Sequence, residues 1–309
     1  MSGNKVNPIT DHIGTGHKRA SGRHFSRRWK LALLGIALVC AICVAGAVKY
    51  YRFYYHVTQQ EVSRTVEHET FDATIRRDKT IKLQIYQQAN ASSQQLVLFT
   101  SGDGGWSPFC ADIAAHLASR GRTVVGFDSK DYLTSFSSSE APVTPEEISR
   151  DYQDILTASR GLNGVNQSAP VILSGWSLGA GYSLLAASTP GIKASVNRVV
   201  AISLPLKNEL AWKPSDALIY ITHGTPHEKV FDSREYIARL GDTPVAIMNA
   251  SDDDNAPIKD AQILYDASPG PKKLYVVKAS GHHFEGGEQE FYQHLDEAFD
   301  ANLVFESLH

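Results

Sequence analysis

Apolar and polar positions change along the chain with two different periods, which predicts that strands and helices follow one another. Residues 65–75 and 80–86 alternate between polar and apolar side chains, as expected for a hairpin at the edge of a sheet. Later apolar runs are short and continuous, which is typical of buried strands. These predicted strands are residues 96–99, 123–127, 171–174, 198–204, 217–222, 244–249 and 273–278, and segments with helical spacing are residues 107–119, 145–160 and 287–303.

This order of elements predicts an α/β domain with a mostly parallel central sheet flanked by helices. A serine-rich run at residues 135–139 is predicted to lie in a loop after the 123–127 strand. Segments 129–144 and 205–216 are the candidate lids over any pocket at the ends of the strands.

The first part of the chain has a different pattern, which predicts a membrane anchor. Residues 1–30 form a basic tail, and residues 31–48 are apolar and carry no charged side chain. That length is just sufficient for a transmembrane helix. Residues 49–64 form a predicted tether that begins with an aromatic and basic stretch, as found at a membrane interface. The basic tail predicts a cytoplasmic N-terminus, with the domain of residues 65–309 on the outer side of the membrane.

A cleaved export signal is the alternative interpretation of the same segment. Ala45-Gly46-Ala47 resembles a signal-peptidase site after an apolar core. In both interpretations the domain is exported, either anchored to the membrane or released after cleavage.

Composition and charge exclude several classes of function. The formal net charge is −3, and no basic face or nucleic-acid motif occurs in the body of the chain, which excludes a nucleic-acid partner. Cys40 and Cys43 lie in the apolar run, so Cys110 is alone in the domain and a disulfide within it is excluded. No spacing of metal ligands is present, and we expect neither a metal nor a cofactor.

A Gly-x-Ser-x-Gly pattern provides the strongest indication of chemistry. Gly175, Ser177 and Gly179 follow the predicted strand at residues 171–174 and precede a run of small residues typical of a helix start. This arrangement predicts a nucleophile elbow, a tight turn that presents a serine between a strand and a helix. The helix directs its amide groups and its positive dipole end at the serine. Ser177 is therefore the predicted nucleophile.

A serine nucleophile needs a base, and the base needs a carboxylate that orients it, in the chain order Ser, Asp, His. After the 244–249 strand, Asp253 has the expected spacing from Ala250 and Pro257, with Asp252 as a close second and Asp254 as a third candidate. The alternative is that these aspartates have no catalytic role and form an acidic turn that caps the helix starting near Pro257.

The base is predicted to follow the last strand. Two histidines, His282 and His283, come directly after the 273–278 strand, and we favour His282. Both lie in the chain order that the nucleophile and its carboxylate require.

An oxyanion hole needs backbone amides directed at the developing negative charge. The amide of Leu178, directly after the nucleophile, is one predicted donor. The other is predicted in the glycine-rich loop at residues 101–106, where Asp103 is favoured and Gly104 comes next. The lysine and hydroxyl residue of a phosphate-binding P-loop are absent from this loop.

Four segments give the chain a recognisable likeness to a known family. Ser-Gly-Asp-Gly-Gly-Trp at residues 101–106, Val-Gly-Phe-Asp-Ser at 125–129, Gly-Trp-Ser-Leu-Gly-Ala-Gly at 175–181 and Gly-His-His-Phe at 281–284 resemble the bacterial virulence proteins of the AcvB/VirJ family. The likeness covers about residues 65–305. It departs from the family at Asn249-Ala250, where Tyr-Gly is usual.

The resemblance implies an exported α/β-hydrolase that acts on an aminoacyl ester of phosphatidylglycerol, chiefly lysyl-phosphatidylglycerol. It also implies that the domain is in the periplasm, either anchored in the bacterial inner membrane or released after signal cleavage. An ammonium group on such a substrate would favour nearby carboxylates, so Asp103, Gly104 and Asp128 are the predicted substrate-binding residues. Asp128 has a structural alternative as a helix cap or loop brace. The other functions that we consider are an esterase or lipase for a different substrate and a non-catalytic envelope protein in virulence or secretion. The sequence specifies no protein partner.

Overall fold

The computed structural model describes residues 31–45, 66–89, 94–137, 143–211 and 229–305. The predicted strand at 217–222, the tether at 49–64 and the end of the predicted span at 46–48 lie outside these residues. The chain divides into two compact units, Met1–Arg52 and Phe53–His309, which we describe separately.

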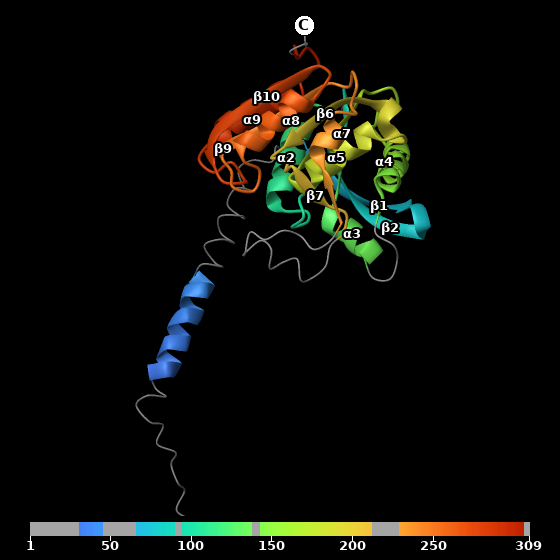
Figure 1. The fold of residues 1–309 in the computed structure, drawn as a ribbon. Helices are drawn as coiled ribbons and strands as arrows, with labels where there is room; N and C mark the ends of the chain where they lie inside the picture. The colour runs from blue at the N-terminus through green and yellow to red at the C-terminus, as the bar shows by residue number, and fades with distance from the viewer. Residues whose placement is uncertain (1–30, 46–65, 90–93, 138–142, 212–228, 306–309) are drawn as a thin grey trace, which may run out of the picture. The chain divides into compact units, whose positions relative to one another are not determined.

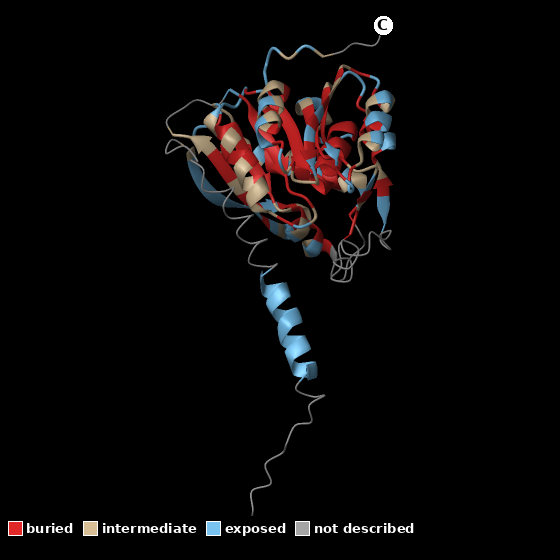
Figure 2. Cartoon of the chain, turned by 90° about the vertical axis from the view of Figure 1, so that its left-hand side faces the viewer, coloured by how far each residue is buried: buried red, intermediate tan, exposed pale blue. Residues whose placement is uncertain are grey.

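The described part of the first unit is a helix over residues 31–45. All its residues are exposed, and its large apolar side chains are between 53% and 72% exposed (Figure 2). Within the described part of the chain, we find no helix with both the length and the apolar character needed to cross a membrane.

The second unit contains an eight-stranded sheet (Figure 1). Its first two strands form an antiparallel edge hairpin, the second also pairs antiparallel with its other neighbour, and all remaining pairs are parallel. The mostly parallel sheet and the edge hairpin are therefore confirmed. In spatial order the strands are β1 (Val66–Ile75), β2 (Lys79–Gln88), β4 (Thr123–Phe127), β3 (Leu96–Thr100), β5 (Val171–Trp176), β6 (Val196–Ile202), β9 (Val245–Asp252) and β10 (Lys272–Ser280).

Helices cover both faces of the sheet, because the central strands are apolar on both sides. Every residue of β3, β4 and β5 is buried (Figure 2). One apolar core lies between the sheet and α2 (Pro108–Ser119) and α9 (Glu288–Ala298). The other core includes α3 (Ser129–Ser137), α4 (Pro145–Arg160), α5 (Leu178–Ser188), α7 (Ser233–Ile237) and α8 (Ile258–Ala267). Two short 3₁₀ helices are η1 (Arg76–Asp78) and η2 (Ile192–Ser195).

Helix α4 begins where the sequence predicted, at Pro145, because its first turn is capped. The Thr144 hydroxyl accepts a hydrogen bond from the Glu147 amide, and the Glu147 carboxylate accepts one from the Thr144 amide. This capping box satisfies two amides that the first turn of a helix leaves unpaired.

Helix α9 is shorter than the predicted 287–303 segment and ends at Ala298. The guanidinium of Arg198 donates hydrogen bonds to the carbonyls of Ala298 and Asp300, and Arg122 donates one to the carbonyl of Phe299. These arginines satisfy carbonyl groups that the end of a helix leaves unpaired, so the helix stops there.

The prediction of a loop at residues 135–139 was wrong for residues 135–137, because α3 occupies Ser129–Ser137, and residues 138 and 139 lie outside the described ranges. Tyr132, Leu133 and Phe136 lie on one side of this helix and are buried in the core. The carboxylate of Asp128 accepts hydrogen bonds from the first two free amides of the helix. The high serine content of the segment concealed this helical spacing. Of the candidate lid at 129–144, residues 129–137 are therefore helix.

The other candidate lid, at 205–216, contains a strand that the sequence did not predict. Strand β7 (Lys207–Glu209) pairs antiparallel with β8 (Val230–Asp232) in a separate two-stranded sheet. The side-chain amide of Asn208 donates hydrogen bonds to the Ser233 hydroxyl and to the Pro205 carbonyl. The Tyr182 hydroxyl of α5 donates to the carbonyl of Glu209 at 2.7 Å. The described residues of this candidate lid are therefore held against α5.

Candidate active site

Ser177 lies in the tight turn between β5 and α5. Its backbone has φ 56° and ψ −124°, a conformation that costs a non-glycine residue about 1–3 kcal/mol. The turn is possible because Gly175 and Gly179 have no side chains. A Cβ atom added to Gly175 would lie 2.4 Å from the Gly179 carbonyl carbon, and one added to Gly179 would lie 2.1 Å from the Thr100 carbonyl oxygen. This is the strained turn that the Gly-x-Ser-x-Gly pattern predicts.

The N-terminal end of α5 begins directly after Ser177. Leu178 is the first residue of the helix, and Ser177 occupies the N-cap position without capping it by its side chain. The Ser177 carbonyl accepts hydrogen bonds from the Ala180 and Gly181 amides in the first turn. The predicted donor, the Leu178 amide, thus belongs to the first residue of the helix that follows Ser177.

Asp253 and His282 form a hydrogen-bonded pair. The distance between Asp253 Oδ2 and His282 Nδ1 is 2.8 Å, and the Asp253 side chain is completely buried. The other carboxylate oxygen, Oδ1, accepts hydrogen bonds from the amides of Asn255 and Ala256. Burial acts to raise the pKa of Asp253, but the hydrogen bond and charge of His282, together with the two amides, lower it below its ordinary value. Asp253 therefore stays ionised and accepts a hydrogen bond from the Nδ1–H group of His282.

The other two aspartates of the acid turn, Asp252 and Asp254, are exposed. The carbonyl of Asp252 accepts a hydrogen bond from the Gly281 amide at 2.7 Å, which connects the acid turn to the loop that carries His282. The side chain of Asn249, where the sequence departs from the family, donates a hydrogen bond to the carbonyl of Ala256 at 2.7 Å. Asn249 thus holds the acid turn closed, a role that the sequence did not indicate.

His283, the alternative base, has aromatic surroundings. Its ring centroid lies 4.7 Å from that of Trp176 and 5.3 Å from that of Phe109. Burial, and then the proximity of His282, lower the pKa of His283 to about 4. The side chain is therefore neutral near pH 7. Its Nδ1 atom lies 3.7 Å from a carboxylate oxygen of Glu285, not beside Asp253.

The glycine-rich loop at residues 101–106 passes directly beside the nucleophile. A Cβ atom added to Gly102 would lie 3.4 Å from the Ser177 Cβ atom and 2.8 Å from the Trp176 ring. The Gly102 carbonyl accepts hydrogen bonds from the Ser129 hydroxyl and from the Gly105 amide. These two hydrogen bonds hold the loop at Gly102. Asp103 is half-buried, and Gly104 is exposed with open space around it.

Asp128 has the contacts of a loop brace and a helix cap. Its Oδ2 atom accepts a hydrogen bond from the Trp106 amide at 2.7 Å, and its Oδ1 atom accepts two from the first turn of α3. Gly105 adopts φ 90° against this carboxylate, since an added Cβ atom would lie 2.7 Å from it. Both oxygens of Asp128 therefore hold the glycine-rich loop to α3.

Glu209, at the end of β7, is an acidic residue that the sequence did not indicate. Its backbone carbonyl accepts a hydrogen bond from the Tyr182 hydroxyl at 2.7 Å. Burial strongly raises the pKa of Tyr182, and the charges of Tyr152, Glu209 and Asp103 raise it further. Only the tertiary position of β7, which the sequence did not predict, reveals this contact.

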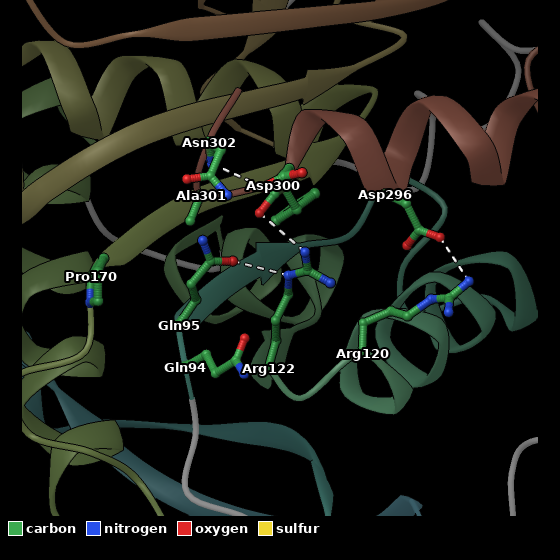
Figure 3. Close-up of a pocket in the computed structure, with 10 residues that line it drawn as sticks. Gln94, Gln95, Arg120, Arg122, Pro170, Asp296, Asp300, Ala301 and Asn302 are labelled. Carbon is green, nitrogen blue, oxygen red and sulfur yellow. Dashed lines mark hydrogen bonds and ion pairs between the residues drawn. The ribbon is translucent and has the colours of Figure 1, made fainter. Parts of the chain in front are cut away.

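A cavity of about 480 Å³ lies at the amino ends of the parallel strands, whereas Ser177 follows a carboxyl end (Figure 3). Its polar lining includes Gln95, Arg122 and Asp296. Arg122 lies between Gln95 and the C-terminal end of α9, and it donates hydrogen bonds to both. Because Ser177 follows the carboxyl end of β5, this cavity is separate from the candidate active site, and its arginine stabilises the end of α9.

Within the described ranges, we find no cluster of three or more His, Cys, Asp or Glu side chains that could hold a metal ion.

Comparison with solved structures defines the fold. The chain is similar to DcsB in complex with its substrate analogue, with a TM-score of 0.60 and 16% identity over 77% of this chain and 99% of DcsB. It is also similar to a putative dienelactone hydrolase from Klebsiella pneumoniae (TM-score 0.57, 12% identity, 76% of this chain and 98% of the other). A dienelactone hydrolase from Anabaena variabilis gives a TM-score of 0.55 at 16% identity, covering 76% and 98%. Together with the strand order and the turn at Ser177, these similarities define an α/β-hydrolase fold.

The family follows from the sequence itself. The family model described as bacterial virulence protein (VirJ) matches residues 94–302, so the chain belongs to the VirJ family. No curated protein matches the chain. The resemblance inferred from the four sequence segments is confirmed.

Proposed function

We propose that this protein is a serine ester hydrolase with Ser177 as nucleophile, His282 as general base and Asp253 as the carboxylate that orients the base. One observation carries the proposal. A serine held in a strained turn at the start of α5 accompanies a hydrogen-bonded pair of the buried Asp253 and the half-buried His282 in the same domain. The Trp176 indole, which precedes the nucleophile, contacts the His282 ring with 5.0 Å between ring centroids.

In the proposed first step, His282 Nε2 removes the proton from the Ser177 hydroxyl as Oγ attacks the ester carbonyl carbon. Asp253 accepts a hydrogen bond from Nδ1–H and stabilises the imidazolium that forms. The carbonyl oxygen becomes negatively charged, and the amides of Leu178 and Asp103 donate hydrogen bonds to it.

The tetrahedral intermediate then collapses. The bond from the carbonyl carbon to the alcohol oxygen breaks, and the imidazolium gives its proton to the leaving alcohol. This leaves an acyl group on Ser177. His282 next removes a proton from water, water attacks the acyl carbon, and the free acid leaves as Ser177 regains its proton.

We further propose that the ester is an aminoacyl-phosphatidylglycerol, chiefly lysyl-phosphatidylglycerol, and that the domain faces the periplasm from an anchor in the inner membrane. The helix over 31–45, with its exposed apolar side chains, supports an anchor whose predicted span continues to residue 48. Asp103 is half-buried in the glycine-rich loop that packs beside Ser177, and it supplies negative charge for a substrate ammonium group.

Lipid vesicles test the proposed substrate directly. The full chain in detergent is mixed with phosphatidylglycerol vesicles that contain lysyl-phosphatidylglycerol, and free lysine is measured. The proposal expects lysine release. Release of fatty acid instead would indicate a lipase, and the absence of any hydrolysis by folded protein would favour a non-catalytic envelope protein.

Replacing Asp103 by asparagine should reduce the preference for cationic substrates by about five- to tenfold, because a partly exposed charge pair contributes about 1 kcal/mol. The measurement is the ratio of kcat/KM for lysine p-nitrophenyl ester to that for hexanoic acid p-nitrophenyl ester. These substrates share a six-carbon chain and differ in the ammonium groups. The ratio separates charge recognition from any general loss of activity.

Asp242→Asn is the matched control for this prediction. Asp242 is exposed in the loop before β9, at the amino end of the sheet, so its loss removes the same charge far from Ser177. Its ratio should equal that of the unmodified chain. An unchanged ratio in Asp103→Asn would refute the role of Asp103 in recognising the ammonium group.

A further inference from the structure

Trp176 is a buried residue that contacts both the nucleophile turn and the loop of the proposed base. It is the last residue of β5 and directly precedes Ser177, and it is 6% exposed. Its indole Nε1–H donates a hydrogen bond to the backbone carbonyl of His282 at 3.0 Å. The same ring contacts the His282 imidazole, with a centroid distance of 5.0 Å.

The other surroundings of Trp176 fix the position of its ring. A Cβ atom added to Gly102 would lie 2.8 Å and 2.9 Å from two carbons of the indole, so the glycine-rich loop packs directly on it. This packing against the loop backbone keeps the indole N–H at a defined position. Phe109 adds an edge-to-face contact on the ring, with 5.3 Å between ring centroids.

The loop that carries His282 is held on both sides of this residue. The amides of Ser280 and Glu285 donate hydrogen bonds to each other's carbonyls, and Phe284 is fully buried. Gly281 adopts φ 70°, which a side chain would disfavour, and its amide donates to the Asp252 carbonyl. At His282 itself, Asp253 contacts the imidazole at Nδ1, and the Trp176 indole N–H contacts the backbone carbonyl. Of these contacts, the indole bond is the one that holds the backbone at the residue that bears the base.

We propose that Trp176 is a positioning residue for the reaction, because its indole N–H holds the His282 backbone so that the imidazole reaches Ser177 and Asp253 together. This inference rests on the proposed function. It gives the residue before the nucleophile a role beyond packing, since a displacement of about 1 Å in a catalytic group can reduce the rate about a hundredfold.

Trp176→Phe tests the proposal because it keeps an aromatic ring and removes the N–H. With a p-nitrophenyl ester, kcat should fall by about 10- to 100-fold while KM stays within about twofold, since the bond positions the base and contacts no substrate. If Trp176→Phe does not fold, site-specific replacement by benzothienylalanine retains the indole shape and replaces the N–H by sulfur. The same fall in kcat is expected.

Phe109→Leu is the matched control. It disturbs the aromatic packing around Trp176 but leaves the indole N–H and its acceptor in place. Its kcat should stay within about threefold of that of the unmodified chain. An equal loss of kcat in Phe109→Leu and Trp176→Phe would show that packing alone matters, and it would overturn the proposal.

A double-mutant cycle asks whether Trp176 acts through His282. Rates of labelling by a fluorophosphonate are measured in the unmodified chain, in Trp176→Phe, in His282→Ala and in the double variant. The proposal expects Trp176→Phe to slow labelling about tenfold or more alone and to have no further effect once His282 is absent. An undiminished effect in the His282→Ala background, or an unchanged rate in Trp176→Phe, would refute it.

The failures of the two proposals are distinguishable. If the unmodified, folded chain reacts with no fluorophosphonate, the proposed function fails and this inference fails with it. If the unmodified chain reacts at Ser177 and Trp176→Phe reacts equally fast, only the role of Trp176 is refuted.

Discussion

Asp253→Asn should lower kcat for ester hydrolysis by about 10³- to 10⁴-fold with little change in KM. The pKa of Asp253 lies below its ordinary value, so the side chain is a carboxylate at neutral pH. It accepts a hydrogen bond from the Nδ1–H group of His282. An asparagine at this position can donate to Nδ1, which favours the tautomer with its proton on Nε2. That tautomer cannot accept the proton of Ser177.

Asp252→Asn serves as the control for this prediction, because its side chain is exposed and only its backbone carbonyl contacts the His282 loop. Its kcat should remain within about twofold of the unmodified value. Steady-state kinetics with a p-nitrophenyl ester measures both variants. A large loss in Asp252→Asn together with a small one in Asp253→Asn would mean that the acid is assigned to the wrong residue.

Gly179→Ala should lower the free energy of unfolding by about 4 kcal/mol or more, which few single substitutions do. The added methyl carbon would lie 2.1 Å from the carbonyl oxygen of Thr100 and 2.4 Å from that of Ser101. Both are backbone atoms in and after the central strand β3, so they cannot move aside without displacing the sheet. Urea unfolding followed by tryptophan fluorescence measures the change.

Gly104→Ala is the matched substitution in open space, since nothing lies within 4 Å of the added carbon. Its free energy of unfolding should stay within about 0.5 kcal/mol of the unmodified value. A stable Gly179→Ala variant would contradict the tight packing of α5 against the end of β3.

Much of the fold was predictable because its strands are buried on both sides. A parallel sheet covered by helices produces short, continuous apolar runs, and β3, β4 and β5 have this character at every position. The turn at Ser177 was predictable because two close backbone contacts exclude every side chain at Gly175 and Gly179. Local steric demands of this kind leave a pattern that can be read in the sequence.

The features that escaped prediction depend on contacts between distant segments. Helix α3 contains many serines, and only its packing on the core distinguishes it from a loop. Strand β7 is three residues long and forms only by pairing with β8, which lies later in the chain. The hydrogen bond from Trp176 to His282 joins residues separated by 106 positions. No local pattern specifies such contacts.

The location of a covalent fluorophosphonate adduct tests the central claim most directly. An activated serine oxygen attacks the phosphorus atom, fluoride leaves, and the phosphonyl group stays on that serine. Peptide mass analysis of the labelled, folded chain should place the group on Ser177, and Ser177→Ala should prevent labelling. An adduct on a different residue, or no adduct on folded protein, would contradict a nucleophilic Ser177.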